Sequence, residues 1–231
     1  MKIIYLHHSG FIIELERITL IFDAITNILP QFLRKGRKNY FFVTHSHHDH
    51  FAQHILSYGS DYDTTYIFSD DIPKKGGRNI HYIAPYQDLE LDGIQIKTFG
   101  STDLGVSFYV EAEGHKLFHA GDLNWWDWDT ETRPHINPEV EERDYKNIIQ
   151  KIVDTVGDRQ IDVAFVPVDS RLEGSACRAA EYFIDSLHPE VLVPMHFWED
   201  FSMIKTIKDR TAGSGTLIPD FDDRNQIIYE D

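Results

Sequence analysis

The pattern of hydrophobic and polar positions changes its period near residue 138. Before this point, short apolar or alternating runs are bounded by Gly, Asn or Asp, which is typical of strands. The predicted strands span residues 3–7, 11–16, 19–22, 40–44, 65–68, 94–99, 106–112 and 116–119. The first half of the chain is therefore expected to be rich in β-structure.

The second half alternates helices with strands. Apolar residues recur at helical spacing from Tyr145 to Val156, after Pro138, a residue type favoured at helix starts. Further helices are predicted near residues 177–187 and 201–210, and strands at 163–168, 191–194 and 226–229. This order favours an α+β fold in which two sheets pack face to face with helices outside. Without a repeat or a linker, the 231 residues are expected to form one domain, 1–231.

Composition predicts a soluble cytoplasmic protein. No stretch approaches the roughly 20 apolar residues that span a bilayer, so no membrane association is expected. The N-terminal run M-K-I-I-Y-L-H-H lacks the apolar core of a signal peptide. The lone Cys177 cannot form an internal disulfide, which agrees with a reducing compartment.

The net charge of -16 repels polyanions, so nucleic acid is a poor candidate partner. Two small basic clusters, residues 34–38 and 74–78, are interpreted as solvated turns. A small molecule is the expected substrate. The oligomeric state is not predicted.

The run T-H-S-H-H-D-H, residues 44–50, carries the strongest chemical signal. It follows directly on the apolar run Y-F-F-V, where a chain leaves a sheet and its side chains can converge. Imidazole and carboxylate donors suit Zn²⁺ or a similar divalent ion. In a core, so many polar groups would remain unpaired at a high cost in free energy. The run therefore predicts a metal site containing His45, His47, Asp49 and His50, with His48 facing away.

This run resembles the signature of the metallo-β-lactamase superfamily, and two further motifs occur in the same order. A-G-D-L-N places Asp122 at the position of the metal-bridging carboxylate, and M-H-F places His196 at that of the last ligand. The opening L-H-H-S-G-F, followed by L-I-F-D, is similar to the branch of ascorbate-6-phosphate lactonases and related metal-dependent hydrolases. The resemblance covers nearly the whole chain and implies a four-layer αββα sandwich.

The resemblance also implies two divalent metal ions, Zn²⁺ or alternatively Mn²⁺. His45 and His47 would bind the first, and Asp49, His50 and His196 the second, with Asp122 bridging both. A pair of such ions generates a hydroxide nucleophile near neutral pH, and Asp49 would orient it. His8 would donate a proton to the leaving group; a structural role for His8 is the alternative.

One position departs from the family pattern. The stretch that usually supplies the third histidine of the first metal reads G-S-T-D-L-G-V-S here, with Ser101 in its place. Serine is a weak metal ligand. Either Asp103 substitutes for it, or water does, or the first metal binds weakly.

Three further residues are candidates for the substrate pocket. Trp125 and Trp126 belong to the run N-W-W-D-W-D, and aromatic loops often form pocket walls; a structural lid or an oligomer contact is the alternative. Asp169 follows a predicted buried strand and is interpreted as a partner of a ligand histidine or as half of an ion pair with Arg171.

Together these features predict a metal-dependent hydrolase of a small-molecule ester, lactone, amide or phosphodiester bond. A nucleic-acid-processing nuclease is one alternative, disfavoured by the acidity of the chain. A non-hydrolytic metal-binding or redox module is another, which Ser101 makes conceivable. The pattern does not identify the substrate.

Overall fold

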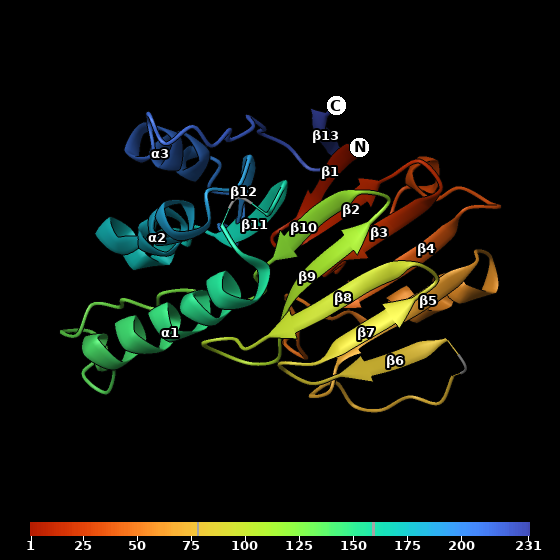
Figure 1. Ribbon diagram of the computed structural model, residues 1–231, viewed down its shortest axis with the longest axis horizontal. Coiled ribbons are helices and arrows are strands. Elements are labelled where there is room, and N and C mark those ends of the chain that lie inside the picture. The colour runs from red at the N-terminus through yellow and green to blue at the C-terminus, as the bar shows by residue number, and fades with distance from the viewer. Residues whose placement is uncertain (78, 159) are drawn as a thin grey trace.

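Two mixed β-sheets pack face to face in the computed structural model, which describes residues 1–77, 79–158 and 160–231 (Figure 1). Arg78, the last residue of the second basic cluster, lies outside this part. Sheet A has the order β13-β1-β2-β3-β4-β5-β6, and sheet B has the order β12-β11-β10-β9-β8-β7. The strands of sheet A are β1 (Lys2–His7), β2 (Gly10–Glu14), β3 (Ile18–Phe22), β4 (Lys38–Val43), β5 (Thr64–Ser69), β6 (Ile80–Ile83) and β13 (Gln226–Glu230). Those of sheet B are β7 (Asp88–Leu91), β8 (Ile94–Phe99), β9 (Ser107–Ala112), β10 (His115–His119), β11 (Val163–Pro167) and β12 (Val191–Met195).

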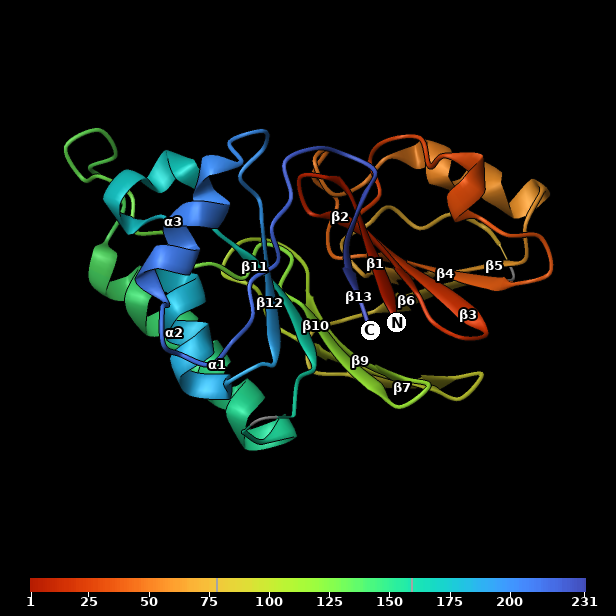
Figure 2. The same ribbon diagram turned by 90° about the horizontal axis from the view of Figure 1, so that it is seen from above.

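The outer face of sheet B is covered by three α-helices, α1 (Pro138–Val156), α2 (Arg178–Leu187) and α3 (Ser202–Arg210) (Figure 2). Helix α1 begins after Asn137, whose side chain accepts a hydrogen bond from the backbone N–H of Glu139. Of its predicted apolar stripe, four residues are buried and two, Val153 and Val156, are half-buried; the buried ones are Tyr145, Ile148, Ile149 and Ile152. The helical periodicity of the sequence therefore identified this layer.

The outer face of sheet A is covered by two 3₁₀-helices, η1 (Pro30–Phe32) and η2 (Gln53–Ser60) (Figure 2). Ile55 of η2 is buried in a second apolar cluster with Ile4, Phe41 and Phe68 of the sheet. The predicted α+β sandwich with four layers is present. On this side its outer layer consists of 3₁₀-helices and loops.

Strand β1 shows why the central strands are apolar along their whole length. Successive side chains point to opposite faces of a sheet. Ile3 and Tyr5 are buried between the two sheets, whereas Ile4 and Leu6 are buried beneath the outer layer of sheet A. Because both faces of the strand are covered, its sequence does not alternate between apolar and polar residues.

Two strands, β6 and β7, were not predicted. Each lies at one edge of its sheet, opposite β13 and β12 respectively. Strand β7 reads D-L-E-L, with Asp88 and Glu90 exposed and the two leucines half-buried. An edge strand with one partner and one solvated face carries too short an apolar signal to stand out.

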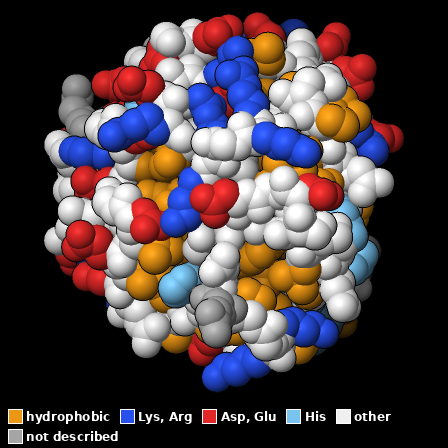
Figure 3. Space-filling view, turned by 90° about the vertical axis from the view of Figure 1, so that its right-hand side faces the viewer, with side chains coloured by type: hydrophobic (Ala, Val, Ile, Leu, Met, Phe, Trp, Pro, Cys, Tyr) orange, Lys and Arg blue, Asp and Glu red, His pale blue; other side chains and the backbone are white. Residues whose placement is uncertain are grey.

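Two surface features complete the description. Within the part of the chain that the structure describes, no helix has the length and hydropathy needed to cross a bilayer. Figure 3 shows the side of the molecule away from the three α-helices, where hydrophobic side chains are visible between acidic and basic ones.

The strand directions bring the carboxyl ends of two strand sets to one edge of the sandwich. In sheet A, β1 and β3 are each antiparallel to β2, and β4 is parallel to β3. In sheet B, β10, β11 and β12 are parallel. Functional residues of such sheets gather beyond the carboxyl ends of parallel strands, and here six strands contribute.

Candidate metal centre

Each of these six strands is followed, within three residues, by a polar side chain that is almost fully buried. The residues, in chain order, are His8, Asp23, His45, Asp122, Asp169 and His196. His8, Asp23 and His196 have positive φ angles of 56°, 40° and 65°. Such left-handed conformations are uncommon outside glycine and gather at functional sites.

Asp122 is the centre of the cluster. Its Oδ1 lies 3.0 Å from Nε2 of His50 and 3.1 Å from Nε2 of His196. Its Oδ2 lies 3.5 Å from Nε2 of His45, which is 3.1 Å from Nδ1 of His47. Asp49 has a carboxylate oxygen within 4.8 Å of ligand atoms of His50 and His196. The six residues predicted as metal ligands therefore converge.

The donor atoms of this cluster fit a cation. Nε2 of His50, Nε2 of His196 and Oδ1 of Asp122 are buried and have no hydrogen-bond partner among the described residues, although each nitrogen lies within 3.1 Å of that oxygen. Unsatisfied buried polar atoms are costly. Imidazole nitrogens and a carboxylate oxygen facing one another are the donor set of a divalent metal site.

Two further carboxylates orient the histidines from behind. His50 donates from Nδ1 to Oδ2 of Asp23 at 2.7 Å, and His196 donates from Nδ1 to Oδ2 of Asp169 at 3.1 Å. In both histidines the other ring nitrogen, Nε2, is directed at Asp122. Such partners fix the tautomer of a metal-binding histidine. The role predicted for Asp169 as partner of a ligand histidine matches this geometry. Asp23 was missed, although it lies in the quoted L-I-F-D motif.

Two glycines clamp the start of the metal-binding loop. A Cβ at Gly105 would lie 2.0 Å from the backbone oxygen of Thr44, and one at Gly121 would lie 2.8 Å from the Thr44 Cβ. Both have positive φ angles, of 72° and 55°. Thr44 in turn donates to Asp23 from its backbone N–H and its hydroxyl. These contacts hold the loop against both sheets.

Several residues of the cluster have strongly shifted pKa values. Burial opposes a charge on Asp122, but His50 and His196 outweigh it and lower its pKa well below the usual range. Burial also disfavours protonation of His196, yet Asp122 and Asp169 raise its pKa to about 9. In His45 burial dominates and lowers the pKa to about 4. Mutual charge stabilisation of this kind marks a functional site.

Asp103 lies close enough to take part in the first metal position. Its Oδ2 is 3.7 Å from Nδ1 of His47, and its carboxylate groups with His47 and Asp122 within 4.8 Å. Ser101 instead accepts a hydrogen bond from the backbone N–H of Asp103. The geometry supports the substitution of Asp103 for the missing histidine.

His8 lies beside Asp49 and His196, outside the lining of the cavity above the cluster. It is fully buried between the rings of Trp198 and His196, at 4.2 and 4.1 Å, and does not line the cavity above the cluster. Burial lowers its pKa to about 4, so it is neutral near pH 7. Its Nε2 faces Asp49 Oδ2 at 3.5 Å, and it groups with Asp49, His50 and His196. The catalytic role of His8 stays a prediction, beside the alternative of a structural role.

A cavity of about 480 Å³ lies over the cluster, and the tryptophan run forms part of its wall. Trp126 and Trp128 line it, with their rings stacked 5.8 Å apart. Trp125 faces the other way and packs on Tyr145 and Tyr182 of α1 and α2. The ring of Trp125 therefore lies outside the lining of this cavity, and its role in a substrate pocket stays a prediction. The rings of Trp126 and Trp128, two positions apart in this loop, stack on the same side, so Trp128 forms the second part of the wall.

Asp169 does not line the cavity either. It is fully buried beneath the cluster, where it accepts hydrogen bonds from Arg171 as well as from His196. His48, expected to face away, is exposed and borders the cavity mouth.

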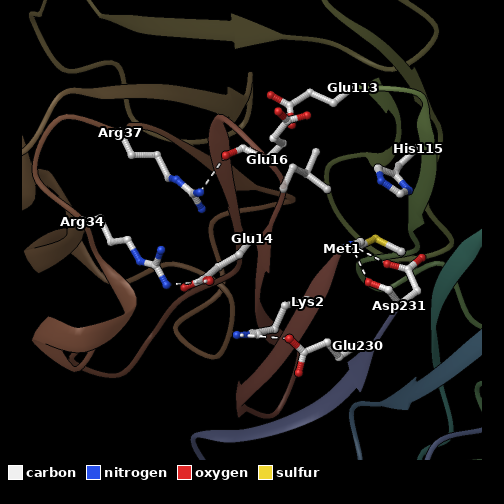
Figure 4. A pocket seen from close by; sticks show the side chains of 11 residues that line it. Met1, Lys2, Glu14, Glu16, Arg34, Arg37, Glu113, His115, Glu230 and Asp231 are labelled. Carbon is white, nitrogen blue, oxygen red and sulfur yellow. Dashed lines mark hydrogen bonds and ion pairs between the residues drawn. The ribbon is translucent and has the colours of Figure 1, made fainter.

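A second cleft, of about 440 Å³, is lined by charged residues that largely pair with one another (Figure 4). Arg34 lies 3.5 Å from Glu14, Lys2 lies 3.4 Å from Glu230, and Arg37 donates to the backbone oxygen of Glu16. These pairs leave it without a comparable set of unsatisfied donors.

Comparison with known proteins agrees with this geometry. Residues 2–138 match the beta-lactamase superfamily domain. The chain is 26% identical to a UPF0173 metal-dependent hydrolase from Nanoarchaeum equitans, over 85% of this chain and 84% of that protein. It is 23% identical to a UPF0173 protein from Pyrococcus furiosus, over 85% and 83%. The solved structure of Igni18, a metallo hydrolase from Ignicoccus hospitalis, has the same fold, with a TM-score of 0.67, 19% identity and coverage of 99% and 98%. None of these similarities singles out the ascorbate-6-phosphate lactonase branch, which stays a prediction.

Proposed function

The chain belongs to the beta-lactamase superfamily. From this premise we propose that the protein is a metal-dependent hydrolase, that its metal centre holds two ions, and that its substrate is a small molecule. The observation that carries the proposal is the set of unpartnered, buried donor atoms of His50, His196 and Asp122, which face one another beneath an open cavity. The name of the Nanoarchaeum relative, a metal-dependent hydrolase, supports it.

The donors divide between two positions that share Asp122. His45, His47 and Asp103 would hold the first ion, and Asp49, His50 and His196 the second, with His8 as a further donor. Zn²⁺ and Mn²⁺ both suit nitrogen and carboxylate donors. Bound divalent ions supply Lewis-acid chemistry and activate water for attack on an ester, lactone, amide or phosphodiester bond.

The chain's own residues complete the site. Asp49 lines the cavity, and although burial disfavours its charge, the neighbouring His8 and His50 keep its pKa below the usual range. It is therefore an ionised carboxylate able to accept a proton from the attacking water. Asp23 and Asp169 hold His50 and His196 in one orientation, and Trp126 provides an apolar wall for the substrate.

A panel of chromogenic esters, lactones, anilides and phosphodiesters tests the proposal. The protein is assayed as purified, after chelation, and after reconstitution with Zn²⁺ or Mn²⁺. Turnover of at least one bond class that disappears on chelation and returns with metal is expected. No metal-dependent turnover of any class contradicts hydrolysis. Redox-active bound metal in such an inactive protein favours the alternative redox role instead, and cleavage of single-stranded DNA or RNA favours the nuclease.

A further inference from the structure

The wall of the cavity contains two arginines that the proposed hydrolysis does not use. Arg133 lies in the loop before α1, and Arg171 lies in η3 (Ser170–Ser175), after β11. Both approach the ring of Trp128: the Cζ of Arg133 is 3.7 Å from its centroid and that of Arg171 is 5.5 Å. Cation–π contacts of this kind hold a guanidinium in place without satisfying its N–H donors.

Arg133 is unusual among the arginines of this acidic chain. Eight of the nine described arginines have the guanidinium within hydrogen-bond or ion-pair distance of a carboxylate or a backbone carbonyl oxygen, and Arg133 is the exception. In a chain with 38 acidic and 22 basic residues, acidic partners are abundant, yet the exposed Arg133 has none among the described residues. Arg133 belongs to the cavity lining, and its guanidinium has no protein acceptor among the described residues.

The position of Arg133 is well defined by its backbone. Its N–H donates to the carbonyl of Asp129 at 2.9 Å, and its own carbonyl accepts from Ile136 at 3.1 Å. Arg171 is fixed differently, by a two-pronged contact of its Nε and Nη2 with the buried Asp169. Its Nη1 makes no hydrogen bond with any described residue. Two oriented guanidiniums therefore offer free N–H groups at the same wall.

The wall carboxylate, Glu141, does not neutralise Arg133, since no ion pair forms between them. The other acids of the cavity, Asp49, Asp103 and Asp122, belong to the proposed metal centre. With divalent ions bound to those three, positive charge dominates the cavity. Planar guanidiniums match the geometry of carboxylate and phosphate oxygens.

We infer that Arg133 and Arg171, ordered by Trp128, bind an anionic group, a carboxylate or a phosphate, on the substrate. This inference rests on the proposed function, because it assigns a substrate class to the same cavity. The apolar faces of Trp126 and Ile136 leave room for an uncharged portion next to the anion. A cavity of about 480 Å³ has the size of a small-molecule site.

Calorimetric titration of the metal-loaded protein tests the inference without turnover. The probes are glutarate, inorganic phosphate and the neutral glutaramide. Arg133→Gln is expected to weaken binding of at least one anion about tenfold, the loss of one charge-assisted hydrogen bond. The affected anion distinguishes carboxylate from phosphate. Arg133→Lys keeps the charge but not the planar guanidinium, so its anion affinity should lie between those of the wild-type protein and Arg133→Gln.

Arg143→Gln is the matched control, because Arg143 is exposed on α1, pairs with Asp144 and does not line the cavity. This substitution should leave the affinity for each of the three probes within about twofold of the wild-type value. Equal anion affinities in the wild-type protein and in Arg133→Gln overturn the inference. So does a wild-type affinity for glutaramide that equals its affinity for the anions. The absence of any anion binding at millimolar concentration overturns it as well. Failure of the chromogenic panel would count against hydrolysis only, since these titrations need no reaction.

Discussion

Asp23 accepts a hydrogen bond from Nδ1 of His50 at 2.7 Å, and neither side chain is exposed to solvent. The same carboxylate accepts from the backbone N–H and hydroxyl of Thr44, so the end of β3 fixes the loop after β4. The metal-facing Nε2 of His50 is thereby oriented before any ion binds.

Replacing Asp23 with Asn should lower metal affinity about 10- to 100-fold, because the tautomer and orientation of His50 are no longer imposed. Competition with a chromogenic chelator measures this directly. Asp88→Asn is the control, since Asp88 is exposed on β7 and pairs with Lys97, far from the cluster in the strand order. Equal affinities in wild type and Asp23→Asn would show that the hydrogen bond does not tune the site.

Asp49→Ala should abolish hydrolysis while the protein stays folded. Loss of a general base typically costs about 10² to 10⁴ in rate, and Asp49 is partly open to the cavity, so its removal leaves little buried space. Circular dichroism and the melting temperature check the fold, and kcat on the substrate found in the panel gives the effect. Unchanged turnover would refute its proposed role.

The two metal positions should differ in affinity. The first has His45, His47, the shared Asp122 and the more distant Asp103, whereas the second has Asp49, His50, His196 and the same Asp122. Stepwise titration of the apoprotein should reveal a tight and a looser site. Asp103→Ala should weaken the looser one further, and Ser101→His should tighten it. Two equally tight sites, insensitive to both changes, are incompatible with this assignment.

Trp126 and Trp125 offer a matched pair of substitutions. Trp126→Ala should lower kcat/KM by an amount equivalent to about 1 to 3 kcal/mol, since it removes a cavity wall. Trp125→Ala should instead lower the free energy of unfolding by a few kcal/mol at most, because its ring packs on Tyr145 and Tyr182. The opposite pattern would mean that the loop is oriented differently in solution.

The chelated protein should lose stability between about pH 6.5 and 9. The pKa of His196 is raised from 6.5 to about 9 in the folded, metal-free chain. The stabilisation from its protonated form is complete below the unfolded pKa and is lost as the pH rises through 9, an effect on the order of 3 kcal/mol. Thermal unfolding of apoprotein across this range measures it. His196→Asn should flatten the profile; a wild-type stability that stays constant or rises would contradict the shift.

The sequence alone predicted the residues that converge in the candidate centre, because their chemistry is incompatible with other environments. Four histidines and an aspartate in six residues fit neither a core nor an ordinary loop, and Asp122 and His196 occupy family motifs after apolar strands. Helix α1 and the central strands were also predictable, since burial of one stripe or of both faces leaves a periodic pattern in the chain.

Only the tertiary structure decided the orientation of side chains and the pairing between distant segments. Trp125 points away from the cavity and Trp126 points toward it. These directions depend on the backbone of an irregular loop, which leaves no periodic pattern in the sequence. The burial of His8 depends on Trp198, 190 residues away. Asp23 and His50 are joined because β3 and β4 lie side by side. Hydrogen bonds of this kind act over a few ångströms in space, and their positions in the sequence are set by the strand order alone.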